Sequence, residues 1–472
     1  MTNTATLQVL LFIAGAVALA QSPRTLTPTA TGWTFGQGST ATLLVDGRVL
    51  LVGGPNASLY DPKTSTFTAT TRTYSSTFQS ATLLPDGRVL IAGGTIYPTD
   101  NPSLFPPTAE WEMFDPATGA FAASGFMSFA KACPSAVQLN NGKVLIAGGS
   151  AYLQPFGGAS AEVYDPVSQT FTVAGPYATF PSPDLNPTQS SDGWCPTALL
   201  RADGKVAILW MGSGIGAASE VFDPVTNTFA ALQTPVFQGL PQVASVQLAS
   251  GLALFAGANS SVSLPNTYAG LYDPNSGLVS LTGALNQPMA DTSAVLLPDG
   301  TVLIAENGGE IFDPARGAFT ELGNVYWGGG GTGTALLDGT VLLVDDGGTS
   351  IYHPNKLIPA PALFAVSGNG TAQGAIWNSS TGQAASAQNP AAAGDILCTY
   401  TTNLIEGGVM PPQVSVGGLA AKVLFFGDAP GYPGYFQVNF QVPSGVTAGS
   451  AAPVRLIYFG RSSNATTIAV HQ

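Results

Sequence analysis

Four acidic residues are the side chains of this sequence whose type and placement could do chemistry. Asp291 precedes a short apolar run, whereas Glu306, Asp345 and Asp346 directly follow such runs. Short apolar runs of this kind predict strands, and we expect the four carboxylates to gather at one end of neighbouring strands. Carboxylates held close together repel and raise each other's pKa unless a cation relieves them.

Three interpretations of these acids stay open. Calcium is the cation that such oxygen ligands suit, which makes the four acids candidate metal ligands. A paired acid and base would instead cleave a glycosidic bond. The third interpretation is that the acids are solvated groups on the surface of an acidic protein.

Aromatic residues concentrate in the segments between the apolar runs. The candidates for ligand binding are Tyr97, Tyr152, Trp194, Trp210, Tyr326 and Trp327, and Tyr177 belongs to the same set of segments. Flat apolar rings beside polar groups suit sugar rings or a protein partner. The alternative is that the rings only pack the loops against one another.

The cysteines offer one candidate disulfide. Cys133-Pro134 and Cys195-Pro196 occupy the same register, each about nine residues before the glycine of a turn. The two thiols are therefore predicted to approach each other, and a disulfide fits an exported protein. A Cα separation beyond about 7 Å would prevent the bridge. The third cysteine, Cys398, lies in an apolar stretch and is predicted to be a buried thiol.

The elements that must position these side chains recur seven times. Each unit has the form LL-x-D-G-(R/K/T)-V-L-(I/L)-x-G-G and, after a gap, (Y/F)-D-P. The second anchor falls at Asp61, Asp115, Asp165, Asp223, Asp273 and Asp313, and the seventh unit ends Tyr352-His353-Pro354. A mean spacing of about 49 residues and four short apolar runs per unit are typical of a propeller blade. We predict an all-β fold with a seven-bladed β-propeller over residues 21–355.

The repeat resembles the kelch repeat, and its "LLPDGRVLIAGG" form is similar to the variant in galactose oxidase and glyoxal oxidase. The resemblance covers residues 25–353. It implies that the run before Asp-Gly is the innermost strand and that the Thr-Phe-Thr run is the outermost. Unit seven lacks a good outermost strand after Pro354. We therefore predict that Thr25-Leu26-Thr27 closes the ring by pairing with the blade that contains Val341.

The same resemblance implies copper bound by two Tyr and two His, with one Tyr cross-linked to Cys. This chain has two histidines, His353 and His471. In those oxidases a Tyr-His pair precedes the "LLPDGRV" strand, whereas here Tyr352-His353 occupies the Asp-Pro turn. Tyr326-Trp327-Gly328 stand at the matching place. We therefore do not expect copper, and we expect no cofactor apart from the calcium considered above.

Antiparallel connectivity sorts the loops of such blades onto two faces. The Asp-Gly and Asp-Pro turns are short and uniform and lie on one face. The segments after Gly-Gly and those that lead into the next inner strand lie on the other face, and residues 95–108, 150–160 and 175–194 make it rich in long loops. Loop variation on one face of a rigid scaffold is where binding usually lies.

The glycine pair itself changes on the loop-rich face. Blades one to three have Gly-Gly, whereas blades four, six and seven have Trp210-Met211, Glu306-Asn307 and Asp345-Asp346. Charge placed against the local pattern is a hint of function.

Composition limits the partners and the location. Charged residues make up 9% of the chain and the net charge is −13, so nucleic acid is not an expected partner because phosphate binding needs Lys and Arg. Residues 1–20 carry no charged side chain and end Ala18-Leu19-Ala20, which predicts a signal peptide and a secreted, periplasmic or cell-surface location. The alternative is a buried N-terminal strand. No later apolar run is long enough to span a membrane.

The remaining residues form a second domain. Residues 356–361 are a short linker with proline, and residues 362–472 alternate apolar segments with Gly and Pro turns. Strands are predicted at 423–426, 434–442 and 454–458, and the whole predicts an immunoglobulin-like β-sandwich. The run "GYFQVNFQVPSGVTAGSAAPVRL" resembles a C-terminal domain of secreted acidobacterial proteins, which implies export and modularity.

The sequence thus favours an exported recognition protein that binds a glycan or protein partner on the loop-rich face. The alternative is a polysaccharide-active enzyme that uses carboxylates near Asp291, Glu306 and Asp345.

Overall fold

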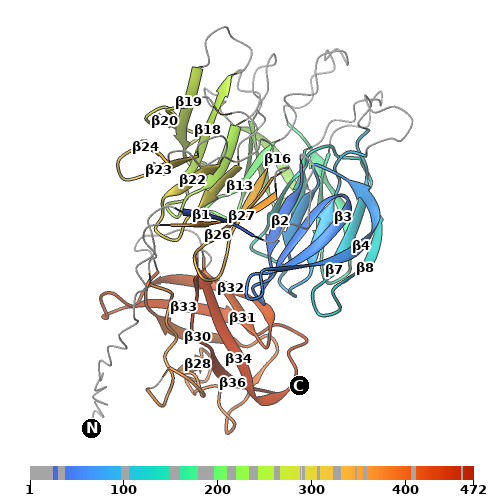
Figure 1. The fold of residues 1–472 in the computed structure, drawn as a ribbon. Coiled ribbons are helices and arrows are strands. Elements are labelled where there is room, and N and C mark those ends of the chain that lie inside the picture. The colour runs from blue at the N-terminus through green and yellow to red at the C-terminus, as the bar shows by residue number, and fades with distance from the viewer. Residues whose placement is uncertain are drawn as a thin grey trace.

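A computed structural model describes residues 25–29, 38–96, 106–148, 160–178, 196–209, 219–232, 243–259, 266–287, 289, 293–305, 309–322, 331–345, 348–354, 359–368, 370–404, 411–458 and 461–471. Within these ranges the chain is all-β and contains no helix. Figure 1 shows a ring of blades above a smaller β domain.

The ring has seven blades, as the repeat predicts. Each blade is an antiparallel sheet whose strands follow one another from the centre outward, and in blade one β3 covers both the second and the third positions. The blades comprise β2 (Thr40–Leu43), β3 (Val49–Asp61), β4 (Thr66–Ser76); β5 (Ser80–Leu83), β6 (Val89–Ala92), β7 (Glu110–Asp115), β8 (Ala120–Phe126); β9 (Ser135–Gln138), β10 (Val144–Ala147), β11 (Ser160–Asp165), β12 (Thr170–Pro176); β13 (Thr197–Leu200), β14 (Val206–Leu209), β15 (Ser219–Asp223), β16 (Thr228–Leu232); β17 (Val243–Gln247), β18 (Ala253–Asn259), β19 (Asn266–Tyr272), β20 (Val279–Leu281); β21 (Ser293–Leu296), β22 (Val302–Ala305), β23 (Glu310–Asp313), β24 (Ala318–Glu321); and β25 (Thr332–Ala335), β26 (Val341–Asp345), β27 (Gly348–His353).

The first four residues of the second strand in each blade are apolar because both faces of the strand are covered there. In β3, Leu50 and Val52 pack against blade two, whereas Val49 and Leu51 pack against blade seven. The same alternation recurs at all seven blade-to-blade interfaces, so each interface has its own apolar core. Strands buried on both faces have continuous apolar sequences, which explains the repeated Val-Leu-Ile-Ala.

The ring closes through the N-terminal strand. Strand β1 (Thr25–Pro28) pairs antiparallel with β27, with Leu26 opposite Tyr352 and Thr27 opposite Ile351. This sheet also contains β26 with Val341, so the predicted closure is confirmed. Leu26 packs against the core between blades six and seven.

The Asp-Gly turns are held by their own aspartates. In blade two, Asp86 Oδ1 accepts a hydrogen bond of 3.1 Å from the Arg88 backbone N–H, and Gly87 has a φ of 86°. A side chain at Gly87 would be strained in this left-handed conformation, which accounts for the glycine. Asp46, Asp203, Asp299 and Asp338 bind the backbone N–H two residues ahead in the same way.

The C-terminal domain is a β-sandwich made from one nearly closed sheet. Its strands are β28 (Ile376–Asn378), β29 (Ala391–Ala392), β30 (Ile396–Thr401), β31 (Gln413–Val416), β32 (Leu419–Asp428), β33 (Phe436–Gln441), β34 (Gly449–Tyr458), β35 (Arg461–Ser462) and β36 (Thr466–His471). Strand β32 pairs with β31 at one end and with β33 at the other, and a bulge between Val423 and Phe425 marks the second pairing. One strand therefore takes part in both layers.

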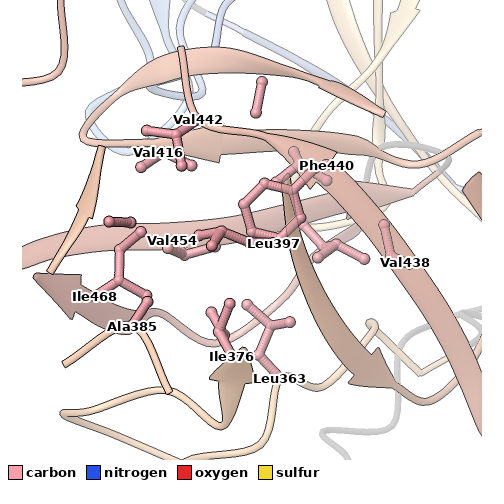
Figure 2. Packing of buried hydrophobic residues seen from close by; sticks show 14 of the residues in the cluster. Leu363, Ile376, Ala385, Leu397, Val416, Val438, Phe440, Val442, Val454 and Ile468 are labelled. Carbon is pink, nitrogen blue, oxygen red and sulfur yellow. The ribbon is translucent and has the colours of Figure 1, made fainter. Parts of the chain in front are cut away.

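Apolar side chains from the two layers meet inside this sandwich. Leu397 and Phe440 of one layer face Val454 and Ile468 of the other, as Figure 2 shows. Each of these four side chains is fully buried. The predicted strands at 423–426, 434–442 and 454–458 correspond to β32, β33 and β34.

The sandwich packs on the face of the Asp-Gly turns. The Ser462 N–H donates to the Leu337 carbonyl, and the Arg461 guanidinium donates to the Asp338 carbonyl. A cavity of about 200 Å³ lies between the two domains, bounded by residues such as Leu84, Leu139 and Val414. Figure 1 shows the sandwich below the ring, so the loop-rich face is the one directed away from it.

Candidate functional site on the loop-rich face

The glycine pairs at the ends of the second strands lie against the segments that lead into the inner strands. A Cβ atom at Gly93 would lie 2.7 Å from the Lys131 carbonyl oxygen of the next blade. One at Gly148 would lie closer than 3.0 Å to the ring of Pro196, also in the next blade. Real Cβ atoms do not approach this closely, so glycine at these two positions is what allows the lead-in segment of the next blade to pack tightly.

Asp345 occupies the position of the first glycine in blade seven. It ends β26, its backbone pairs with Gly348, and the residue is 7% exposed. Among the predicted acids, Asp291, Glu306 and Asp346 lie outside the described residues. Their gathering with Asp345 therefore stays a prediction. Across the described ranges, no group of three or more His, Cys, Asp or Glu is placed to hold a metal ion.

The lead-in segments of blades one to three turn through left-handed backbone. Gly38, Phe78 and Cys133 have φ values of 79°, 55° and 46° at equivalent positions. Phe78 N–H donates to the Gly38 carbonyl at 2.8 Å, which joins two neighbouring lead-in segments. A non-glycine residue in this conformation is uncommon and needs support from its surroundings.

The sulfur of Cys133 is part of a disulfide, and Cys398 is a free, half-buried thiol. Cys195, the predicted partner of Cys133, lies outside the described residues, so this pairing stays a prediction. Burial raises the pKa of the Cys398 thiol.

A row of buried glutamates holds the loops in place. Glu112, Glu162 and Glu310 lie three residues before the Asp-Pro turns of blades two, three and six, and we call them the clamp glutamates. Each is at most 1% exposed, and Glu220 is buried at the equivalent position of blade four. An ionised carboxylate is tolerated in such a place only when its oxygens accept hydrogen bonds.

Each clamp glutamate accepts bonds from the chain that crosses from the preceding blade. Glu310 Oε2 accepts the Asn286 N–H at 3.1 Å, and its Oε1 accepts the Gln287 N–H at 2.9 Å. The two oxygens of Glu162 likewise accept the Ser128 and Phe129 N–H groups at 2.9 and 3.1 Å. The clamp thus ties the segment that follows the outermost strand of one blade to the third strand of the next.

Two clamp glutamates also face a buried cation. Arg72 Nε lies 2.9 Å from Glu112 Oε2, and Lys131 Nζ lies 3.5 Å from Glu162 Oε1. All four side chains are at most 1% exposed. Burial lowers the pKa of both Arg72 and Lys131, and the attraction of the glutamates opposes this shift.

Sequence reasoning missed these glutamates, although a signal for them existed. Glu occurs three residues before the turn aspartate in four of the six units that have this aspartate, at Glu112, Glu162, Glu220 and Glu310. The spacing of Glu from the turn aspartate does not show by itself that these carboxylates are buried between blades.

Tyr177 is a buried residue and not a surface ring of the loop-rich face. It is 8% exposed, its ring packs 4.7 Å from that of Phe229, and its hydroxyl accepts the Gly148 N–H at 3.0 Å. Burial raises its pKa. For this ring, packing of the loops is the interpretation that holds. The other aromatic candidates, Tyr97, Tyr152, Trp194, Trp210, Tyr326 and Trp327, lie outside the described residues.

The two histidines do not fit a copper site built from two His and two Tyr. His353 Nε2 is hydrogen-bonded to Thr27 Oγ1 at 3.0 Å, at the outer edge of blade seven. Tyr352 beside it is buried in the core between blades six and seven. His471 belongs to β36 and lies opposite Ala392 of β29, near the chain end that Figure 1 marks in the sandwich. One imidazole therefore lies in blade seven of the propeller and the other lies in the C-terminal sandwich.

Comparison with known proteins places the fold. No protein-family model and no curated protein matches the chain. Among solved structures, a "novel fungal alcohol oxidase with catalytic diversity among the AA5 family, in complex with copper" is 16% identical, with a TM-score of 0.56, and covers 96% of this chain and 100% of that one. A streptogramin B lyase structure is 12% identical over 70% of this chain and 97% of that one, with a TM-score of 0.49.

At this level of identity the likeness shows the fold, a kelch-like propeller of the kind found in galactose oxidase-like enzymes followed by a β-sandwich. No described segment forms a helix that could cross a membrane.

Proposed function

We propose that this is an exported recognition protein that binds a glycan or protein partner on the loop-rich face of its propeller. The observation that supports this most is the position of the sandwich. It packs on the Asp-Gly turns, so the opposite face of the propeller, at which the second strands end, points away from the sandwich. Variable loops on a rigid scaffold are the usual place for binding.

The glycine contacts suggest which blades hold the site. In blades two and three the glycine pair lets the next lead-in segment approach within contact of the backbone. Trp210, Glu306 and Asp345 replace the first glycine in blades four, six and seven. A side chain at that position needs space that glycine does not, and we propose that this space forms the binding site. We place the ligand over blades four to seven, beside Trp210, Tyr326 and Trp327.

The clamp glutamates support the proposal because they hold the scaffold of the site in order before a ligand binds. They fix the crossings into blades two, three and six through backbone N–H groups. A preorganised site loses less conformational entropy when it binds. The alternative, a polysaccharide-active enzyme, needs a pair of carboxylates across a pocket. Asp345 is the one predicted member in the described residues, and we do not put this alternative forward.

The test is a glycan array probed with residues 21–472, followed by titration of each hit. Trp210→Ala and Trp327→Ala should each raise the Kd at least about fivefold, since truncating an aromatic anchor commonly costs more than 1 kcal/mol. Val225→Ala is the matched control, because Val225 is 91% exposed on the opposite face, in an Asp-Pro turn. If binding persists in both Trp variants, the proposed location is wrong.

A further inference from the structure

The outer face of the C-terminal sandwich carries a group of aromatic rings that is separate from the binding site proposed on the propeller. Trp377 and Tyr400 lie with ring centroids 6.1 Å apart, and Tyr400 and Tyr432 lie 6.4 Å apart. The three rings therefore form one continuous group, which we call the sandwich aromatic face. Trp377 and Tyr400 are half-buried, and Tyr432 is 57% exposed.

Strand register places amide side chains beside these rings. Across β28, β30, β33 and β32, one row reads Trp377, Cys398, Asn439 and Phe425. The neighbouring row, two residues along, contains Tyr400, Gln437 and Gly427. Side chains two residues apart on a strand share a face, so the rings and the amides of both rows lie on the same side of the sheet.

The intervening residues confirm which side this is. Ile376, Leu397, Val438 and Phe440 alternate with these rows and are buried in the sandwich core. Phe425, by contrast, is 46% exposed, and its ring lies 3.4 Å from the place where a Cβ on Gly427 would stand. The Phe425 ring therefore lies beside Gly427 on the outer face.

The two amides are oriented by each other. Gln437 Nε2 donates to Asn439 Oδ1 at 2.9 Å. This bond uses one of several donor and acceptor positions that each amide has. Amides fixed next to apolar rings can exchange hydrogen bonds with hydroxyl groups, while the rings cover C–H surfaces.

We propose that the sandwich aromatic face binds a neutral, soluble glycan chain. Neutrality follows from the side chains, because the two rows contain no charged residue and the whole chain has a net charge of −13, which disfavours an anionic polymer. The acid nearest in sequence, Asp428, lies opposite Phe436 and so alternates with the two rows, and Asp395 already binds Asn378 Nδ2 and the Ala392 N–H.

The angles between the rings favour a single glycan chain over the flat surface of a crystalline polysaccharide as the ligand. Trp377 and Tyr400 make an interplanar angle of 63°, and Tyr400 and Tyr432 make one of 56°. Rings tilted this strongly cannot all lie on one plane, as contact with a crystalline polysaccharide would require. They can follow consecutive sugars of a chain that is free in solution.

The experiment is affinity electrophoresis of the full mature chain in gels that contain soluble xylan, mixed-linkage glucan or galactomannan. Retardation in at least one gel is expected, and Tyr432→Ala and Asn439→Ala should each raise the Kd at least about fivefold. These two variants alter an exposed turn residue and a half-buried amide, so the domain should stay folded, which thermal melting checks. Trp377→Phe should retain part of the affinity that Trp377→Ala loses.

Phe126→Ala is the control, because this ring is 68% exposed on the propeller and should not affect retardation. A lack of retardation in every gel would overturn the proposal, as would full binding by Tyr432→Ala and Asn439→Ala. Retardation that Trp327→Ala abolishes and Trp377→Ala does not would assign binding to the propeller alone. Preference for insoluble crystalline cellulose would contradict the argument from the ring angles.

Discussion

Arg72 Nε lies 2.9 Å from Glu112 Oε2, and the two side chains, each 1% exposed, join blade one to blade two. Arg72 also donates to the carbonyls of Gly54 and Ser76, and Glu112 also accepts the Thr73 and Tyr74 N–H groups. The pair is thus the centre of a hydrogen-bonded network beside the apolar core between blades one and two. Removing one partner leaves an uncompensated buried charge.

Arg72→Ala should therefore lower the free energy of unfolding by about 3–5 kcal/mol, as measured by denaturant titration. Arg316→Ala is the control, since Arg316 is 82% exposed in its pair with Asp313, and we expect a change within about 0.5 kcal/mol. Similar small losses for both variants would contradict the role given to the buried pair.

Glu310→Ala should destabilise the protein by about 2 kcal/mol, because the backbone N–H groups of Asn286 and Gln287 lose the acceptor of their part-buried hydrogen bonds. Hydrogen exchange measures the local effect. The backbone N–H groups of Asn286 and Gln287 should be protected in the wild type and should exchange faster in the variant. Glu321→Ala is matched in residue type and lies directly opposite on β24, but it is exposed. Equal exchange in all three proteins would refute the clamp.

Removing residues 1–29 should open the ring and cause a large loss of stability, because β27 loses its partner strand and Leu26 leaves an apolar core. Thermal melting of two truncated proteins tests this. Removal of residues 1–23 keeps β1 intact and should leave the melting temperature within a few degrees, about the effect of 1 kcal/mol or less. A protein without residues 1–29 that melts at the same temperature would show that β1 is dispensable.

The three cysteines should form one disulfide and leave one thiol that is alkylated slowly. Non-reducing peptide mapping should find Cys133 linked to Cys195, with Cys398 unmodified. Burial raises the pKa of Cys398, so less of it is thiolate at a given pH than in an ordinary cysteine. Its alkylation should be slower than that of glutathione at neutral pH and should accelerate only at higher pH. Two reactive thiols without reductant would contradict the bridge.

The propeller could be predicted from sequence because its physical cause is local and repeated. A strand that is covered on both faces must be apolar throughout, as Val89–Ala92 is, and a tight turn needs Asp and Gly at fixed positions, as in Asp86-Gly87. Seven copies of this pattern determined the number of blades. The lack of an outermost strand after Pro354 determined that Thr25–Pro28 would fill the gap.

Tertiary structure alone decided what surrounds each polar group. Nothing local to Glu112 shows that its oxygens would meet Arg72 and Thr73, since those partners come from the preceding blade. The sequence around Tyr177 likewise has the composition of a surface loop, yet packing against Phe229 buries the tyrosine ring. The face of the propeller that the sandwich covers, and the meeting of Trp377, Tyr400 and Tyr432 on one sheet, depend on contacts between distant segments. Hydrophobic periodicity encodes which side of a strand is buried, but not which other element buries it.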